Sequence, residues 1–151
     1  MDRILIVDDE FLIRYTLEEG LKDRGYDAYS AATVEEGLEF VKKYHPGVLL
    51  LDNLLENSVG MDEIVNFKNA EEDLQVIMMT AYGSVSQAVE ATKRGAYDYI
   101  LKPFDVDEID MLIKRCLEQK RNRDSLVFLK GDVPQFSSVS EAAARIRHHI
   151  Q

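Results

Sequence analysis

The stretch Val48-Leu49-Leu50-Leu51-Asp52-Asn53 decides how this chain folds. Four consecutive apolar residues lead directly into a carboxylate, without the polar alternation of a strand that has one face in water. A short apolar run of this kind indicates a strand that is buried on both faces, as in a parallel sheet covered by helices. In open parallel sheets, ligands bind at the carboxyl ends of the strands. Asp52 is therefore the first candidate for a functional residue.

Apolar strand patterns and helical patterns alternate five times along the chain. The spacing predicts strands at residues 3–7, 26–31, 48–52, 75–79 and 97–101. Each strand is followed by a helical pattern, the last of which runs to about Leu129. This alternation predicts an α/β fold, a flavodoxin-like doubly wound parallel sheet of five strands in the order 2-1-3-4-5, with an extended C-terminal helix.

Local signals mark several helix faces and ends. After the first strand, apolar residues recur at helical spacing at Phe11, Leu12, Tyr15, Leu17 and Leu21. Helix starts are expected at two capping boxes, Thr33 with Glu36 and Asp105 with Glu108, and at Ser84 or Ser86. Gly60, at the end of the loop that follows Asp52, is expected to permit an unusual backbone angle before the third helix.

The composition restricts the partners and the compartment. A net charge of -10 argues against binding of this segment to nucleic acid or to an anionic membrane. The single cysteine, Cys116, excludes an internal disulfide and is typical of a reducing cytoplasm. The N-terminus lacks the layout of a signal peptide, and no apolar run approaches transmembrane length. We therefore expect a cytoplasmic protein.

The chain changes character near residue 120. Residues 1–120 carry the whole strand and helix alternation and are expected to form one domain. Residues 121–151 contain the rest of the long helix, a turn at 131–134 and a short helix at 142–150 with modest apolar content. We interpret residues 121–151 as a helical linker and the start of an output domain that this chain does not contain.

Acidic residues follow two of the expected strands. Asp8 and Asp9 end the first strand and Asp52 ends the third, and these strands are neighbours in the predicted order. Carboxylates a few ångströms apart repel by about 4 kcal/mol per pair at an effective dielectric constant of about 20. Such a cluster needs a cation, and Mg²⁺, or Mn²⁺ in its place, prefers oxygen ligands of this kind.

Two further groups stand at the ends of the remaining strands. Thr80 ends the fourth strand with a hydroxyl and Lys102 ends the fifth with an ammonium group. Each residue alone is more simply explained as a cap or a solvated turn. Together with the acids they suit a phosphoryl group carried on a carboxylate, with Asp52 as the nucleophile and Thr80 and Lys102 as contacts of the phosphoryl oxygens.

The sequence resembles a receiver domain of a two-component response regulator over roughly residues 1–120. The matching motifs, which come in the order of that family, are Ile6-Val7-Asp8-Asp9-Glu10, Leu50-Leu51-Asp52, Met79-Thr80-Ala81 and Tyr99-Ile100-Leu101-Lys102-Pro103-Phe104. The resemblance implies a protein of a phosphorelay and not an enzyme that acts on other substrates. The reactions that such a protein catalyses are its own Mg-dependent phosphorylation and dephosphorylation.

The resemblance also implies roles for individual residues. Asp52 accepts a phosphoryl group from a sensor histidine kinase, and Lys102 contacts it. Asp8, Asp9, Asp52 and the backbone carbonyl of Leu54 bind the metal ion. Thr80 and Tyr99 form the switch pair, and the Lys102–Pro103 peptide is commonly cis in the family.

A narrower resemblance covers residues 80–99, which are similar to the nitrogen-regulation-type activators of the alternative sigma factor. It implies transcription regulation and a homodimer formed through the fourth helix, fifth strand and fifth helix, through the linker helix, or both. Val85, Val89 and Tyr99 are candidates for that face. The chain contains no Gly-x-x-x-x-Gly-Lys-Ser/Thr phosphate loop and no recognisable DNA-reading element.

Some alternatives remain beside this interpretation. A stand-alone receiver that acts by docking onto another protein is the main one. An aspartyl phosphatase would typically carry a second acid at position 54, which holds leucine, and a nucleotide carrier would not place Asp8-Asp9-Glu10 after its first strand. Glu56 departs from the family, in which proline commonly occupies this position, and we interpret it as a solvated loop residue.

Overall fold

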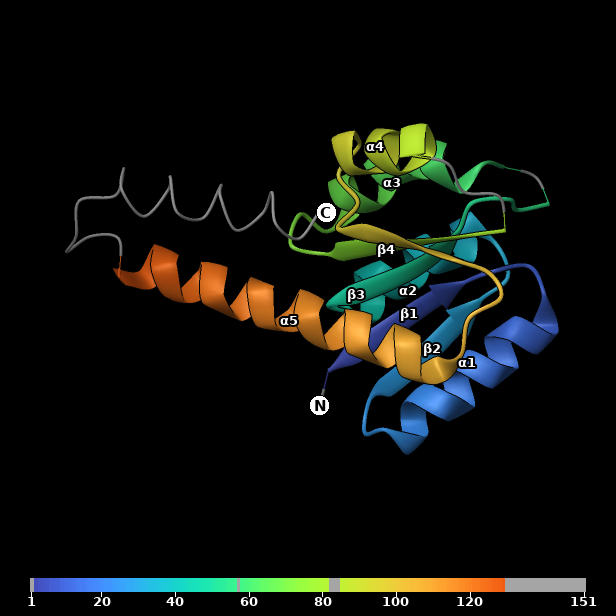
Figure 1. Cartoon of the computed structure of the whole chain (residues 1–151), viewed down its shortest axis with the longest axis horizontal. Coiled ribbons are helices and arrows are strands. Elements are labelled where there is room, and N and C mark those ends of the chain that lie inside the picture. Colours follow the sequence, from blue (N-terminus) through green and yellow to red (C-terminus); the bar gives the residue numbers. More distant parts are fainter. Residues whose placement is uncertain (1, 57, 82–84, 130–151) are drawn as a thin grey trace. The chain divides into compact units, whose positions relative to one another are not determined.

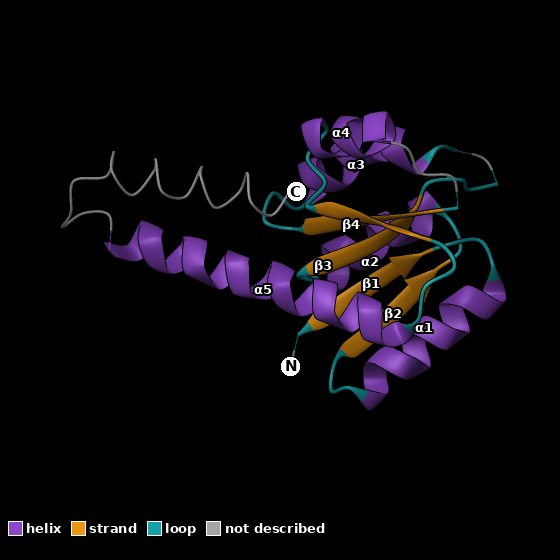
Figure 2. Ribbon diagram, viewed as in Figure 1, coloured by secondary structure: helices purple, strands orange, loops and turns teal. Residues whose placement is uncertain are grey.

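A computed structural model describes residues 2–56, 58–81 and 85–129 of the chain (Figure 1). Within these residues, strands and helices alternate as expected (Figure 2). The elements are β1 (Arg3–Val7), α1 (Phe11–Asp23), β2 (Asp27–Ala31), α2 (Val34–Tyr44), β3 (Val48–Asp52), α3 (Gly60–Ala70), β4 (Gln75–Thr80), α4 (Val85–Lys93), β5 (Asp98–Leu101) and α5 (Val106–Leu129).

The strands form one parallel sheet in the order β2-β1-β3-β4-β5, which confirms the predicted topology. The central strand β3 lies between β1 and β4, and Leu51 is in register with Val7 on one side and Met78 on the other. All five residues of β3 are buried, as its unbroken apolar run predicts. The register brings the carboxyl ends of β1, β3 and β4 to the same edge of the sheet.

Successive residues of each strand point to opposite faces of the sheet and supply two separate cores. On one face, Ile6 and Leu50 pack with residues of α1 and of α5 up to Leu117. On the other face, Leu49 and Leu51 pack with residues of α2, α3 and α4. The helices therefore cover both faces of the sheet, as in a doubly wound fold.

One of the two predicted capping boxes forms completely and the other forms in part. The Asp105 carboxylate accepts a hydrogen bond from the Glu108 backbone N–H (2.9 Å), and Glu108 accepts one from the Asp105 N–H (3.4 Å). Thr33 accepts from the Glu36 N–H at 3.2 Å, but the Glu36 carboxylate reaches the N–H of Ala32 instead of that of Thr33. The predicted cap at Ser84, the turn at 131–134 and the helix at 142–150 lie outside the described residues.

Gly60 has a different structural role from the one expected. The described glycines with positive φ are Gly25 and Gly95, and Gly60 is not among them. A Cβ atom at Gly60 would instead overlap the backbone oxygen of Asp52. Glycine is needed here because the start of α3 passes directly against the backbone of the strand end that carries the candidate acceptor.

The apolar stripe of α1 divides into a buried and an exposed part. Leu17 and Leu21 are buried in the core, whereas the side chains of Phe11, Leu12 and Tyr15 are 68%, 70% and 55% exposed. The two groups lie on different faces of the helix: Ile13 packs against the same core as Leu17 and Leu21, whereas Phe11, Leu12 and Tyr15 lie on the side turned away from it. Among the described residues, no helix is both long and apolar enough to cross a membrane.

Candidate functional site

Three acidic side chains meet at the carboxyl edge of the sheet. Asp8 follows β1 and Asp52 is the last residue of β3, so the pairing of these strands places them side by side. One carboxylate oxygen from each of Asp8, Asp9 and Asp52 lies within 4.8 Å of the other two. Asp8 is fully buried and Asp52 is 5% exposed. The structure thus brings together the three side chains that the sequence predicts as a metal site.

Lys102 reaches into this cluster from the end of β5. Its ammonium group donates hydrogen bonds to Asp8 Oδ2 at 2.8 Å and to Asp52 Oδ1 at 3.1 Å. The backbone N–H of Lys102 donates to the carbonyl oxygen of Thr80 at 2.7 Å, which holds the residue beside the end of β4. The Lys102–Pro103 peptide is cis, as the resemblance implies.

Burial and charge shift the protonation of the central pair. Burial, followed by the negative charge of Asp8, raises the pKa of Asp52 to about 6, although Lys102 opposes this shift. Burial acts to lower the pKa of Lys102, but its hydrogen bond with Asp8 and the charges of Asp8 and Asp52 outweigh burial and raise it. The ammonium group therefore stays charged and partly neutralises the acids.

The donor atoms suit a hard divalent cation. Carboxylate oxygens that converge at a strand edge, with room for water, are typical ligands of Mg²⁺. Asp8 is well oriented, because its Oδ1 accepts the Glu10 N–H at 2.9 Å and its carbonyl oxygen accepts from Arg14 at 2.8 Å. Leu54, whose carbonyl is the fourth expected ligand, pairs with Val59 in the loop after β3.

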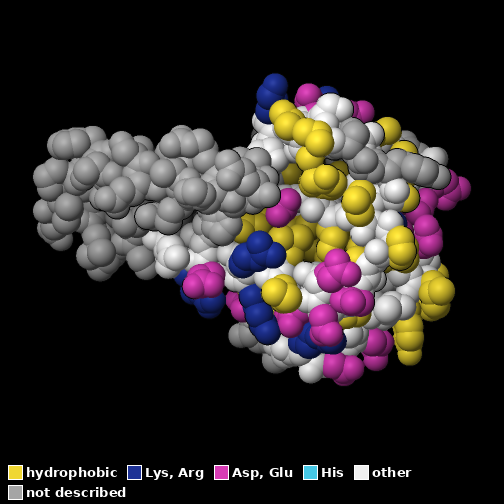
Figure 3. All heavy atoms as spheres, viewed as in Figure 1, with side chains coloured by type: hydrophobic (Ala, Val, Ile, Leu, Met, Phe, Trp, Pro, Cys, Tyr) yellow, Lys and Arg dark blue, Asp and Glu magenta, His cyan; other side chains and the backbone are white. Residues whose placement is uncertain are grey.

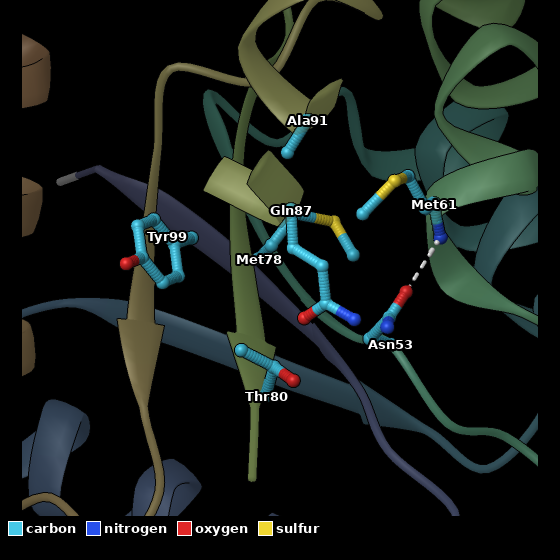
Figure 4. A pocket seen from close by; sticks show the side chains of 7 residues that line it. All are labelled: Asn53, Met61, Met78, Thr80, Gln87, Ala91 and Tyr99. Carbon is cyan, nitrogen blue, oxygen red and sulfur yellow. Dashed lines mark hydrogen bonds between the residues drawn. The ribbon is translucent and has the colours of Figure 1, made fainter. Parts of the chain in front are cut away.

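A small pocket lies between the sheet and α4, and Asn53, the residue that follows Asp52, lines it (Figure 4). Thr80 and Tyr99, the expected switch pair, both line it. The Tyr99 side chain is half-buried, and its hydroxyl points away from the pocket (Figure 4). The other lining residues are Asn53, Met61, Met78, Gln87 and Ala91. Sequence patterns did not single out Gln87, since one polar residue in an amphipathic helix carries no signal of its own.

The face formed by α4 and β5 exposes apolar side chains. Val85 is 81% exposed, and Val89 and Leu101 are each 47% exposed. Figure 3 shows hydrophobic side chains gathered over α4 and β5 on this side of the molecule. Val85 and Val89 were expected here, whereas Leu101 was missed because it stands within a strand motif that reads as buried.

The chain is similar in sequence and fold to known signalling proteins. The chain is 37% identical over 121 residues to sporulation initiation phosphotransferase F of Bacillus subtilis, covering 80% of this chain and 98% of that protein. It is 34% identical over 143 residues to the DNA-binding transcriptional regulator NtrC of Escherichia coli, covering 93% of this chain and 30% of that protein.

The solution structure of the beryllofluoride-activated NtrC4 receiver domain dimer superimposes with a TM-score of 0.75 at 36% identity, covering 80% of this chain and 99% of that one. The chain spans between 26% and 50% of the length of several other curated relatives. The family described as the response regulator receiver domain matches residues 4–114. With its parallel sheet and the acids at its edge, the chain belongs to the response regulator receiver domain family.

Proposed function

We propose that this protein is a phosphorylation-activated switch in which Asp52 accepts a phosphoryl group from a sensor histidine kinase. The observation that carries this proposal is the position of the Asp52 carboxylate, which lies in the acid cluster with Lys102 Nζ 3.1 Å from its Oδ1. A carboxylate held beside a fixed cation at the end of a buried strand is placed to act as a nucleophile toward phosphorus.

The transfer follows from the groups around Asp52. An Asp52 oxygen attacks the phosphorus atom of the donor, forming a P–O bond as the bond from phosphorus to the donor's imidazole nitrogen breaks, and the electron pair leaves with that nitrogen. Lys102 lies where it can stabilise the negative charge on the phosphoryl oxygens. Asp8, Asp9, Asp52 and the Leu54 carbonyl would hold Mg²⁺, or Mn²⁺, which when bound neutralises charge on the phosphoryl group.

We infer that Thr80 and Tyr99 convert phosphorylation into a change of surface. Thr80 ends β4 next to the acceptor strand, so its hydroxyl can move toward a phosphoryl oxygen. Tyr99 lies on the neighbouring strand and lines the same pocket. When Thr80 moves, the Tyr99 ring gains room to turn inward, which alters the face of α4, β5 and α5.

The exposed part of α1 is the surface that we propose for the kinase. Phe11 and Leu12 follow the acid cluster directly in the chain and are more than two-thirds exposed. Exposed apolar side chains at the rim of a reactive site are typical of a protein docking surface. A kinase that delivers a phosphoryl group to Asp52 must approach over this rim.

We further propose that residues 1–120 form the receiver and that residues 121–151 lead into an output domain for transcription regulation. The similarity to NtrC, of which this chain spans 30%, supports that arrangement. The activated NtrC4 receiver is a dimer, and the exposed Val85, Val89 and Leu101 support a homodimer of this chain through its face of α4, β5 and α5. The cytoplasm is the expected compartment, with no direct contact to nucleic acid or membrane by this segment.

A stand-alone receiver is the second candidate. The similarity to the Bacillus subtilis phosphotransferase supports it, because the match covers 98% of that protein. Such a protein would pass its phosphoryl group or its signal to another protein by docking. The coding sequence beyond Gln151 discriminates between the two, since an ATPase signature there would establish the transcription activator.

The test of phosphoryl transfer is direct labelling. Incubation with Mg²⁺ and acetyl phosphate is expected to add one phosphoryl group to the protein, detected as a mass increase of the intact chain. The Asp52→Asn variant is expected to show none. Asp73→Asn makes the same change at an exposed carboxylate outside the acid cluster; it serves as the matched control and should label normally. Full labelling of Asp52→Asn would refute the assignment.

A further inference from the structure

The pocket that Thr80 and Tyr99 line contains a polar side chain that comes from α4. Gln87, in the first turn of that helix, lines the pocket together with Thr80 and Tyr99. Figure 4 shows its amide group between the side chains of Thr80 and Asn53. The rest of the lining is mainly apolar. Gln87 therefore links two parts of the proposed switch. It belongs to α4, a helix of the proposed output face, and it lines the same pocket as Thr80, whose hydroxyl is proposed to move.

Gln87 occupies space that an inward Tyr99 would need. The Tyr99 ring forms one wall of the pocket, with its hydroxyl directed outward (Figure 4). To turn inward, the ring must enter the region between β4 and α4, where Gln87 lies. Two side chains cannot fill the same volume in a packed region, so their positions are mutually exclusive.

The Gln87 side chain already contacts water while it lines the pocket. Gln87 is exposed, so its amide keeps hydrogen-bonding partners in solvent when it swings out of the pocket. A buried polar group would instead resist such a movement. The Gln87 side chain is therefore suited to block the Tyr99 ring in the resting state and to move aside when Thr80 moves.

The other end of α4 is tied to α3. Just after α4, Arg94 donates to Asp62 Oδ1 at 2.7 Å and to Glu90 Oε2 at 2.8 Å. Of these two exposed pairs, the one with Asp62 joins this end of α4 to α3, and the one with Glu90, within α4, helps to orient the guanidinium group. We expect a shift of α4 to be largest at the opposite end, which carries Gln87.

We propose that Gln87 is a positioning residue of the switch, whose side chain holds Tyr99 in its outward position until Thr80 moves. This inference rests on the proposed function, because it requires a phosphorylation-driven movement of Thr80. It adds that the size of the Gln87 side chain maintains the resting state. A smaller side chain at this position should favour the inward position of Tyr99 even without a phosphoryl group.

The test compares two substitutions at this position in the full 151-residue chain. Gln87→Ala removes the bulk, whereas Gln87→Met keeps the length and removes the amide; both residues favour a helix, so folding is preserved. Lys93→Ala, at an exposed position of the same helix, is the control. The chain is labelled with 3-fluorotyrosine, and the resonance of Tyr99 among the seven tyrosines is assigned with a Tyr99→Phe variant.

In Mg²⁺ without a phosphoryl analogue, Gln87→Ala is expected to move the Tyr99 resonance toward the position that the wild-type chain reaches with beryllofluoride. By linkage, its affinity for beryllofluoride should rise by about five-fold or more. Gln87→Met and Lys93→Ala should match the wild type in both measurements.

An unchanged Gln87→Ala variant beside a responsive wild type would overturn this inference alone. Equal shifts in Gln87→Ala and Gln87→Met would also overturn it, because the amide and not the bulk would then hold Tyr99. A wild-type chain whose Tyr99 does not respond to beryllofluoride would overturn the proposed function together with the inference.

Discussion

At the scale of single residues, the environment of Asp52 works against its own ionisation. The carboxylate is 5% exposed and faces Asp8 across the junction of two strands. These two effects raise its pKa to about 6, in spite of the hydrogen bond from Lys102. The nucleophile is therefore charged at neutral pH at a cost to the stability of the fold, a cost that a bound cation offsets.

This cost predicts how the free energy of unfolding depends on pH. Since the pKa of Asp52 is higher in the folded state than in the unfolded chain, its stabilising effect is complete below about pH 4 and is lost as the pH rises through about 6. The difference in free energy of unfolding between Asp52→Asn and the wild type should therefore change by about 2–3 kcal/mol in favour of the variant as the pH rises from 4 to 7.5. A difference of one pKa unit corresponds to about 1.4 kcal/mol.

Urea unfolding with a metal chelator present measures this difference. Asp73→Asn, which makes the same change at an exposed carboxylate, is the control. A gap between Asp52→Asn and the wild type that does not change between pH 4 and pH 7.5 would contradict the prediction.

At the scale of elements, the loop from β3 to α3 fits closely against the acceptor strand. The N–H of Gly60 donates to the carbonyl oxygen of Asn53 at 2.7 Å, and Asn53 Oδ1 accepts from the N–H of Met61 at 3.1 Å. The first turn of α3 is thereby fixed to the residue that follows Asp52. This contact leaves no room for a Cβ atom at Gly60.

We predict that Gly60→Ala destabilises the protein by about 3 kcal/mol, as expected for overpacking against a backbone that cannot easily shift. Because the clash falls on the backbone of Asp52, the variant should also take up the phosphoryl group from acetyl phosphate more slowly at temperatures where it remains folded. Thermal unfolding measures the loss of stability, and the rate of labelling measures the slower uptake of the phosphoryl group.

Val65→Ala, an exposed position of the same helix, is the control for the change in side chain and should leave both measurements near the wild type. Normal stability of Gly60→Ala would show that the start of α3 can move away from β3.

At the scale of the whole molecule, the apolar surface of α4 and β5 predicts an association that depends on phosphorylation. Replacing Val89 or Leu101 by aspartate places a charge on a face whose apolar side chains are about half exposed. Each variant is expected to remain monomeric with Mg²⁺ and beryllofluoride, under conditions in which the wild type forms a dimer, because burying an unpaired carboxylate at an interface is costly.

Sedimentation velocity measures the association, and labelling by acetyl phosphate confirms that the site still works. Val65→Asp carries the same charge on α3, at a side chain that is 55% exposed, and should dimerise like the wild type. Loss of dimer in all three variants, or in none, would argue that this face is not the interface.

The sequence by itself determined the architecture and the members of the site. A strand buried on both faces must be apolar at every position, so the unbroken runs revealed the parallel sheet. Parallel strands end at one edge, so Asp8, Asp52, Thr80 and Lys102 were predictable from their places after those runs. These are local signals, which do not depend on how the elements pack.

Only the tertiary structure decided which side chains face a neighbour and which face water. Phe11 and Leu21 are both apolar residues of α1, yet Phe11 is exposed and Leu21 is buried, because only one of the two faces that carry them packs against the sheet. Gly60 is required by the approach of a helix to a strand, and Gln87 lines the pocket because the first turn of α4 lies near Thr80 at the end of β4. Such contacts join residues that are distant in the chain, and no periodicity along the sequence records them.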